Sequence, residues 1–415
     1  MRPSLTAPPA GTGERRAPIG LDYWSPRFGR LSAAVGVSAL GDPISLTLSQ
    51  YLLFRATHSA FALAGIYLSQ IAAALLVGLL AGAITDRLDR RSLVVGLELS
   101  RAIVVALLPV ATLVSPFALY PALFLVGGVE AVVQPARLAG VPGMVGSAHV
   151  ERASASLLLL TTIGQALGFA LAGLLIGVLP RPELLFLIDA LTFAVAGVLV
   201  LSVGSLGGSV TAVRLSGVIL RALASPRLRP HLFIAGAVAL LTSMLAPALL
   251  PLSYELSAHG VSVYASLQVL LIVGAGVGSL VAHKIGAGRG VLLAALWVFG
   301  LGVLGAGLAH TFWLTGAGVA ISAVGNAIYF ISNQSTLLRE AQEDNRGSVM
   351  SARYSVVQVA RVVGLGAGAA VTTLGSGGTT LTLVGVVLLV LAAAAVPWLI
   401  QREGKRVETP LPPDV

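Results

Sequence analysis

Long apolar stretches separated by short polar breaks dominate the chain. About 20 consecutive apolar residues cross the ~30 Å hydrocarbon core of a bilayer. Twelve stretches reach roughly that length and predict twelve membrane-spanning helices. A β-barrel would instead show alternating strands of about ten residues, so we expect an all-α membrane protein. The predicted helices cover residues 31–54, 61–84, 93–114, 119–141, 153–179, 183–203, 231–254, 261–284, 291–309, 312–337, 349–374 and 378–400.

A longer hydrophilic stretch, residues 204–230, divides the predicted helices into two groups of six. Two equal groups around one central loop are typical of membrane proteins built from two homologous halves. The expected organisation is an N-terminal tail of residues 1–30, a first half of residues 31–203, the central loop, a second half of residues 231–400, and a C-terminal tail of residues 401–415. We predict pseudo-symmetry between the halves.

The basic residues predict the orientation in the membrane, because Lys and Arg accumulate in cytoplasmic loops. With the N-terminus inside, twenty of the 26 Lys and Arg residues fall in the tails and loops of that side. Two, Arg55 and Arg181, fall on the opposite side, and four lie within helices. We expect a multi-pass protein of the inner (plasma) membrane with both tails and the central loop in the cytoplasm. This topology explains the net charge of +9 without nucleic-acid binding.

Composition narrows the possible chemistry. Hydrophobic residues make up 56% of the chain and charged residues 10%, with a mean hydropathy of +0.92, whereas a soluble domain has about 25% charged residues. Cysteine is absent, and the six histidines show no paired ligand spacing. No nucleophile triad or phosphate-binding loop is recognisable. We therefore expect no enzyme activity, no metal and no cofactor, and an ion gradient as the energy source.

The most informative polar break follows the second predicted helix and reads Asp86-Arg87-Leu88-Asp89-Arg90-Arg91. Together with Gly82 it resembles the signature loop between helices 2 and 3 of the major facilitator superfamily of transporters. The resemblance implies the twelve-helix fold of that family and a gating loop of Gly82, Asp86, Arg87, Arg90 and Arg91. In this role Asp86 would accept hydrogen bonds from the N-terminus of helix 11 and hold the outward-open state. The alternative is a plain basic cytoplasmic loop.

Three further motifs are similar to one subgroup of that superfamily, which contains enterobactin-type siderophore exporters and macrolide exporters. They are Gly41-Asp42 in the first predicted helix, Pro135-Ala136-Arg137 in the fourth, and Arg346-Gly347-Ser348-Val349 before the eleventh. The likeness implies an exporter. One departure is the stretch 168–173, which lacks the Pro of the Gly-Pro-x-x-Gly-Gly pattern common in antiporters of the superfamily.

Two acidic residues, Asp42 and Glu130, lie about eleven residues into their predicted helices, near mid-membrane. A charge at that depth costs roughly 2.5–3.5 kcal/mol on insertion scales, so each must face a cavity or a partner. Burial favours the neutral form of a carboxyl group, which suits a proton carrier. We predict that Asp42, Glu130 or both couple the protein to a proton gradient or contact the substrate, which at Glu130 would be a cation. A structural role as an ion partner inside the bundle is the alternative.

Further polar residues complete the predicted coupling site and substrate cavity. Arg361 lies at mid-depth and needs a carboxylate, helix carbonyl oxygens or an anionic group of the substrate, and Asp42 is a candidate partner. Arg137 lies two turns from Glu130, too far for a direct pair. The full predicted set is Asp42, Glu130, Arg137, Asn326, Tyr329 and Arg361.

Three other charged residues inside the predicted helices are expected to stabilise the fold rather than to bind protons or substrate. Glu98 and Arg101 are three residues apart in the third predicted helix, so they predict a local ion pair beside the signature loop. Asp189 in the sixth predicted helix is interpreted as a helix-packing acid.

The functional hypothesis is a proton-coupled exporter of hydrophobic or amphipathic small molecules, of the drug or siderophore class, that works by alternating access. One alternative is a lipid or lysolipid flippase of the same fold. Another is a non-transporting membrane scaffold or sensor, which the mid-membrane charges disfavour. The expected partners are the substrate, protons and the bilayer, and we expect a monomer.

Overall fold

The computed structural model describes residues 24–85, 89–204, 228–341 and 346–407, and every regular element in these ranges is helical. The first group comprises α1 (Pro26–Thr57), α2 (Ala60–Thr85), α3 (Arg90–Val114), α4 (Leu119–Gly140), α5 (Pro142–Val145), α6 (Val150–Leu175) and α7 (Leu185–Leu201), with short 3₁₀ turns at Pro116–Ala118, Ser147–His149 and Pro182–Leu184. The second group comprises α9 (Arg229–Leu245), α10 (Leu249–Leu256), α11 (Gly260–Ile285), α12 (Arg289–Leu308), α13 (Phe312–Glu340), α14 (Arg346–Leu374) and α15 (Gly377–Val407).

The predicted all-α membrane architecture is confirmed. In the described part of the chain, eleven helices are long and apolar enough to cross a bilayer, and α9 and α10 form a possible twelfth span with a bend of 43°. The sequence predicted one continuous helix over residues 231–254. Pro247 lies in the break and has no N–H group to continue the helical hydrogen bonds.

The largest differences from the predicted helix ends are at the start of α1 and at the end of α15. α1 begins at Pro26 rather than at residue 31, because Ser25 Oγ accepts a hydrogen bond from the Phe28 N–H group at 3.1 Å and Pro26 occupies the first helical turn. These capping residues are not apolar, so the hydrophobic pattern did not include them. α15 continues to Val407, beyond its predicted end at residue 400.

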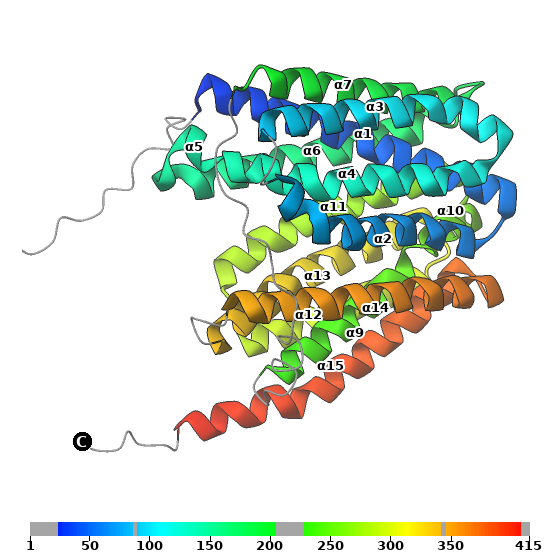
Figure 1. Ribbon diagram of the computed structural model, residues 1–415. Coiled ribbons are helices and arrows are strands. Elements are labelled where there is room, and N and C mark those ends of the chain that lie inside the picture. The colour runs from blue at the N-terminus through cyan, green and yellow to red at the C-terminus, as the bar shows by residue number, and fades with distance from the viewer. Residues whose placement is uncertain (1–23, 86–88, 205–227, 342–345, 408–415) are drawn as a thin grey trace, which may run out of the picture.

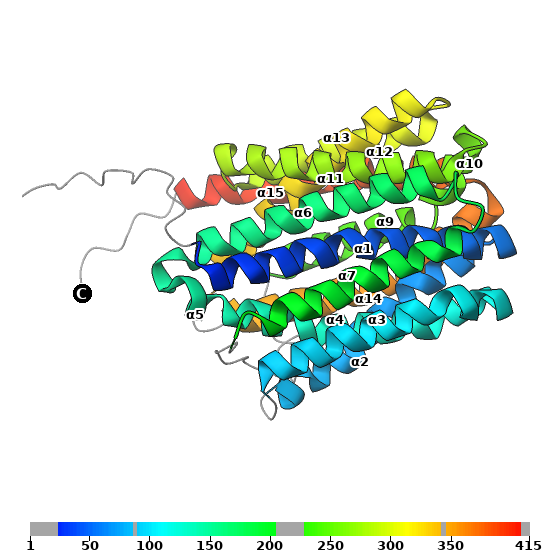
Figure 2. The same cartoon turned by 90° about the horizontal axis from the view of Figure 1, so that it is seen from above.

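The helices form a single bundle in which the two groups lie side by side. In Figure 1, α3 and α7 lie at one edge and α15 at the other, with α2 and α11 between them. Figure 2 shows the same bundle from above, with α1 running beside α6 and α7.

Matching glycine pairs hold equivalent helices together in the two groups. A Cβ atom at Gly168 of α6 would overlap the carbonyl oxygen of Leu40 in α1, and one at Gly368 of α14 would overlap that of Met244 in α9. Gly164 and Gly364 make the corresponding contacts one turn earlier. Such small residues let helix backbones approach closely within a membrane. The packing of α6 on α1 is thus repeated by α14 on α9, which agrees with the predicted pseudo-symmetry of the two halves.

The two groups of helices contact each other at one end of the bundle. There α6 packs on α11 and α2 packs on α14. Ser262 Oγ donates a hydrogen bond of 2.7 Å to the carbonyl oxygen of Gly173, and the rings of Phe54 and Tyr254 stack with centroids 5.6 Å apart. These contacts lie near the C-terminal ends of α1 and α6. They are remote from the end of the bundle where α1 begins and α15 ends, on the left in Figure 1.

Single cysteines will test the predicted orientation, because the chain has none of its own. His310 is exposed between α12 and α13, and Lys284 is exposed near the end of α11. With cytoplasmic termini, we expect His310→Cys to react with an impermeant maleimide added to intact cells. Lys284→Cys will react only after permeabilisation. The opposite pattern of labelling would reverse the topology.

Candidate functional site

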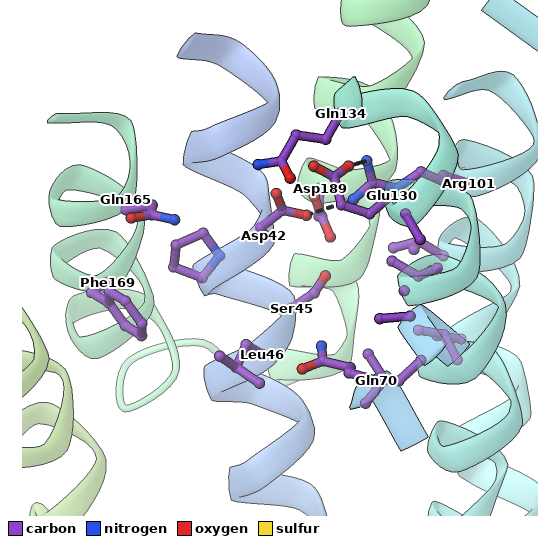
Figure 3. Close-up of a pocket in the computed structure, with 18 of the residues that line it drawn as sticks. Asp42, Ser45, Leu46, Gln70, Arg101, Glu130, Gln134, Gln165, Phe169 and Asp189 are labelled. Carbon is purple, nitrogen blue, oxygen red and sulfur yellow. Dashed lines mark hydrogen bonds and ion pairs between the residues drawn. The ribbon is translucent and has the colours of Figure 1, made fainter. Parts of the chain in front are cut away.

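A cavity of about 670 Å³ lies within the first group of helices. Residues of α1, α2, α3, α4, α6 and α7 line it, and Tyr354 of α14 adds a contact from the second group. Figure 3 shows Asp42, Arg101, Glu130 and Asp189 gathered on one side, while Gln165 and Phe169 of α6 lie across from them. We call this space the charged cavity.

Arg101 of α3 joins carboxylates from two other helices. Its Nη2 atom lies 2.9 Å from Asp42 Oδ1 of α1, and its Nη1 atom lies 2.7 Å from Glu130 Oε2 of α4. The Arg101 side chain is 2% exposed, whereas those of Asp42 and Glu130 are 43% and 38% exposed. The two carboxylates therefore remain accessible from the cavity, and the guanidinium group is buried behind them.

The buried face of Arg101 meets an aromatic ring and a second ion pair. Its guanidinium group lies 3.9 Å from the centroid of the Phe193 ring, within the range of a cation–π contact. Glu98 of α3 is fully buried and pairs with Arg137 of α4, and its Oε1 atom lies 3.8 Å from Arg101 Nη1. Since Glu98 and Arg137 neutralise each other, Arg101 is left to compensate the acids that line the cavity.

Asp189 brings a third carboxylate to the same place. It is 1% exposed, and its Oδ1 atom accepts a hydrogen bond of 3.2 Å from Thr192 Oγ1. A Cβ atom at Gly41 would overlap Asp189 Oδ1 and Thr192 Oγ1. Glycine beside Asp42 thus lets α7 approach α1. The predicted packing role of Asp189 is incomplete, because this residue also lines the charged cavity.

A second cavity of about 390 Å³ lies mainly within the second group of helices. Its described lining residues include no Asp, Glu, Lys, Arg or His. The polar ones are Tyr67, Thr242, Tyr264, Gln268, Ser322 and Asn326. We call it the apolar cavity. Phe169 of α6 lines both cavities. The other large apolar side chains of this cavity are Leu245, Leu249, Leu271, Ile272, Phe299, Val303, Val319 and Leu381.

The structure separates the residues that the sequence grouped as one cavity. Asp42 and Glu130 face the charged cavity, and Asn326 lines the apolar one. Arg137 is buried against Glu98 and is not among the lining residues of either cavity. Tyr329 is 3% exposed and likewise lines neither of the two cavities.

The predicted pairing of Asp42 with Arg361 is wrong. Asp42 bonds to Arg101, and Arg361 is an exposed side chain of α14 that donates a hydrogen bond of 3.2 Å to Gln358 Oε1. The reason is the packing of the helices. α14 packs on α9 and α2, whereas α1 and α3 both pack on α7, and this brings the Arg101 side chain of α3 to Asp42.

Part of the predicted gating loop can be placed. Gly82 lies in α2, and Asp86 and Arg87 fall outside the described residues. Arg90 opens α3, and Arg91 donates a hydrogen bond to the carbonyl oxygen of Leu201 at the end of α7.

Asp89 caps α3. Its Oδ2 atom accepts hydrogen bonds from the Ser92 N–H group at 2.9 Å and from Ser92 Oγ at 2.7 Å. The bond from the Ser92 backbone holds the pKa of Asp89 below its usual value. Asp89, the second acidic residue of the loop, thus fixes the start of α3.

Sequence reasoning missed the central role of Arg101 and the interhelical role of Glu98. Their spacing of three residues on α3 predicts only one local pair between them. The available signal was their position inside an apolar helix, where an ionisable residue generally faces the interior of the bundle. The shorter contacts of Arg101 go to α1 and α4 rather than to Glu98.

Comparison with known proteins agrees with this architecture. The family model described as Major Facilitator Superfamily matches residues 28–225 and 231–414. No curated protein matches the chain in sequence.

Solved structures with the same fold cover nearly the whole chain. The nucleoside transporter NupG has 14% identity and a TM-score of 0.71 over 90% of this chain and 99% of its own. An auto-inhibited POT family peptide transporter has 13% identity and a TM-score of 0.70 over 91% and 97%. A bacterial homologue of the human lysosomal transporter Spinster, inward-facing and unoccupied, has 15% identity and a TM-score of 0.67 over 89% and 96%.

Proposed function

This chain belongs to the Major Facilitator Superfamily of membrane transporters, and we propose that it is a proton-coupled exporter of hydrophobic or amphipathic small molecules. In this role it is an antiporter of the drug or siderophore class, like the enterobactin-type and macrolide exporters that its motifs resemble. It acts as a monomer in the plasma membrane with cytoplasmic termini, uses the proton gradient, and contributes to multidrug efflux.

The observation that carries this proposal is the set of acids around one buried guanidinium. Asp42, Glu130 and Asp189 line the charged cavity, and Arg101 is the one cation among its described lining residues. Three ionised carboxylates beside one cation in a membrane interior are unfavourable. Binding a proton removes part of the excess charge. The excess negative charge therefore favours proton binding at these carboxylates, and the proton can be released when the cavity opens to the other side.

Alternating access explains how proton binding is linked to movement. The contacts between the two groups of helices lie at the end remote from the start of α1. With the N-terminus in the cytoplasm, this end faces outward, so the conformation corresponds to the inward-facing state. Rocking of the two groups would open the outer contacts and expose Asp42 and Glu130 to the other side. Protons released inward would then drive substrate outward.

The decisive experiment is efflux in proteoliposomes with an imposed pH gradient. We expect the protein to move substrates from a panel of dyes, macrolides and siderophores against their concentration gradients only when the gradient is present. A protonophore should stop this movement within the time of gradient collapse. If accumulation is unchanged by the protonophore, or no compound in the panel moves, the proposal of a proton-coupled exporter fails.

A further inference from the structure

The charged cavity and the apolar cavity share a wall. Phe169, which is 8% exposed, is the side chain that lines both. It lies on α6, one turn after Gln165 of the charged cavity, and it packs in the same apolar cluster as Leu249 and Phe299 of the second group. Figure 3 shows it across the charged cavity from Asp42 and Glu130. Phe169 therefore lies at the junction of the two spaces.

The two cavities differ in charge. Asp42 and Glu130 present partly exposed carboxylates to the first cavity, while Arg101 is 2% exposed and already bonded to both of them. An anionic ligand would meet these carboxylates and could not reach a free guanidinium face. A cationic ligand would replace part of the charge compensation that the site lacks.

The apolar cavity offers a different kind of contact. Its described lining has no charged side chain, and leucine, isoleucine, valine, phenylalanine and alanine make up thirteen of its nineteen lining residues. Burying apolar ligand surface there favours binding, because that surface is removed from water. The volumes of about 670 and 390 Å³ both lie within the usual range for drug-sized ligands.

We propose that the two cavities form one composite binding site for a cationic amphiphile. The cationic group lies among Asp42, Glu130 and Asp189, and the apolar body extends past Phe169 into the apolar cavity. Phe169 is the specificity-determining residue at the junction, where its ring contacts the apolar body and its face can attract the cation. The assignment rests on the proposed function and adds the sign of the substrate's charge and the way it is oriented.

Two ions of nearly the same shape and opposite charge test the assignment. Tetraphenylphosphonium and tetraphenylborate are titrated separately by calorimetry into the purified full-length protein, with no gradient present. We expect saturable binding of the phosphonium at least tenfold tighter than that of the borate. Tetramethylammonium, a cation without the apolar body, should bind at least a hundredfold more weakly than the phosphonium. Equal or tighter binding of the borate would overturn the cationic assignment.

Variants locate the site. Glu130→Gln should weaken phosphonium binding at least tenfold, whereas the control Glu151→Gln, at the exposed start of α6, should leave it unchanged. Phe169→Ala should weaken it at least tenfold, and Phe169→Leu, which retains apolar bulk and is less demanding for folding, at least threefold. Gel filtration and thermal unfolding confirm that each variant is folded. Unaltered binding in Glu130→Gln, or in Phe169→Leu, would refute the composite site.

Binding and transport can fail independently in these experiments. Phosphonium binding with the expected variant profile, but without pH-driven efflux, supports the composite site and contradicts the proposed exporter. Proton-driven efflux of uncharged or anionic compounds, with no selective phosphonium binding, supports the exporter and contradicts the composite site.

Discussion

Replacing both cavity-facing carboxylates, by Asp42→Asn and Glu130→Gln, will abolish uphill export while downhill exchange at high substrate concentration remains measurable. The amide side chains keep the shape of the site and can still accept hydrogen bonds from Arg101, but they cannot carry a proton at neutral pH. Movement of the substrate then no longer requires movement of a proton. Each single variant should retain part of the gradient-driven accumulation if the two carboxylates share the proton.

The measurement is accumulation in proteoliposomes with and without a pH gradient, for the wild-type protein, both single variants and the double variant. A matched control, Glu151→Gln with Glu183→Gln, removes two acids that do not line either cavity. If the double variant still concentrates substrate at more than about a hundredth of the wild-type level, neither residue carries the proton. Asp189, the remaining acid of the charged cavity, and other coupling ions would then be the next candidates.

Removing the guanidinium by Arg101→Leu will reduce transport at least a hundredfold and destabilise the protein. Loss of the Arg101 contacts leaves Asp42 and Glu130 without their cation. Breaking a fully buried ion pair costs about 3–5 kcal/mol. Here the carboxylates are more than a third exposed and can hydrate or bind protons, so we expect a smaller loss, about 1–3 kcal/mol. Arg101→Lys keeps a charge but cannot hold both carboxylates in the same geometry, so its transport should fall about tenfold.

A compensating variant separates the loss of stability from the loss of transport. Combining Arg101→Leu with Asp42→Asn and Glu130→Gln removes the uncompensated charges as well as the cation. Thermal unfolding should return most of the way to the wild-type midpoint, whereas pH-driven transport should remain absent. Arg181→Gln, on an exposed arginine between α6 and α7, serves as the control. A triple variant as unstable as Arg101→Leu would show that Arg101 acts through packing on Phe193 rather than through charge.

The apolar pattern predicted the membrane architecture well because the bilayer imposes a length and a polarity on every span. It failed where capping or proline chemistry decides a boundary. Ser25 and Pro26 start α1 early, and Pro247 interrupts the predicted seventh helix. These are local effects of one or two polar or cyclic residues, which an average over 20 residues does not register.

The depth of Asp42 and Glu130 was also readable from the sequence, because a charge in the middle of an apolar run is costly wherever it points. Their partner was not. Arg101 lies 59 residues from Asp42 and 29 from Glu130 along the chain, and Arg361 at mid-depth was an equally reasonable choice on charge alone. The contacts of α3 with α4, and of α1 with α7, selected Arg101 and placed Asp189 beside it.

The sequence by itself therefore determined the number and polarity of the spans, the distribution of basic residues and the presence of charges at mid-membrane depth. The tertiary structure decided which of those charges neutralise one another, that Arg137 and Tyr329 are buried outside both cavities, and that Phe169 lines both a charged space and an apolar one. The physical reason is that insertion into a bilayer acts on each segment separately. Pairing of charges depends instead on distances of a few ångströms between helices, which only their packing sets.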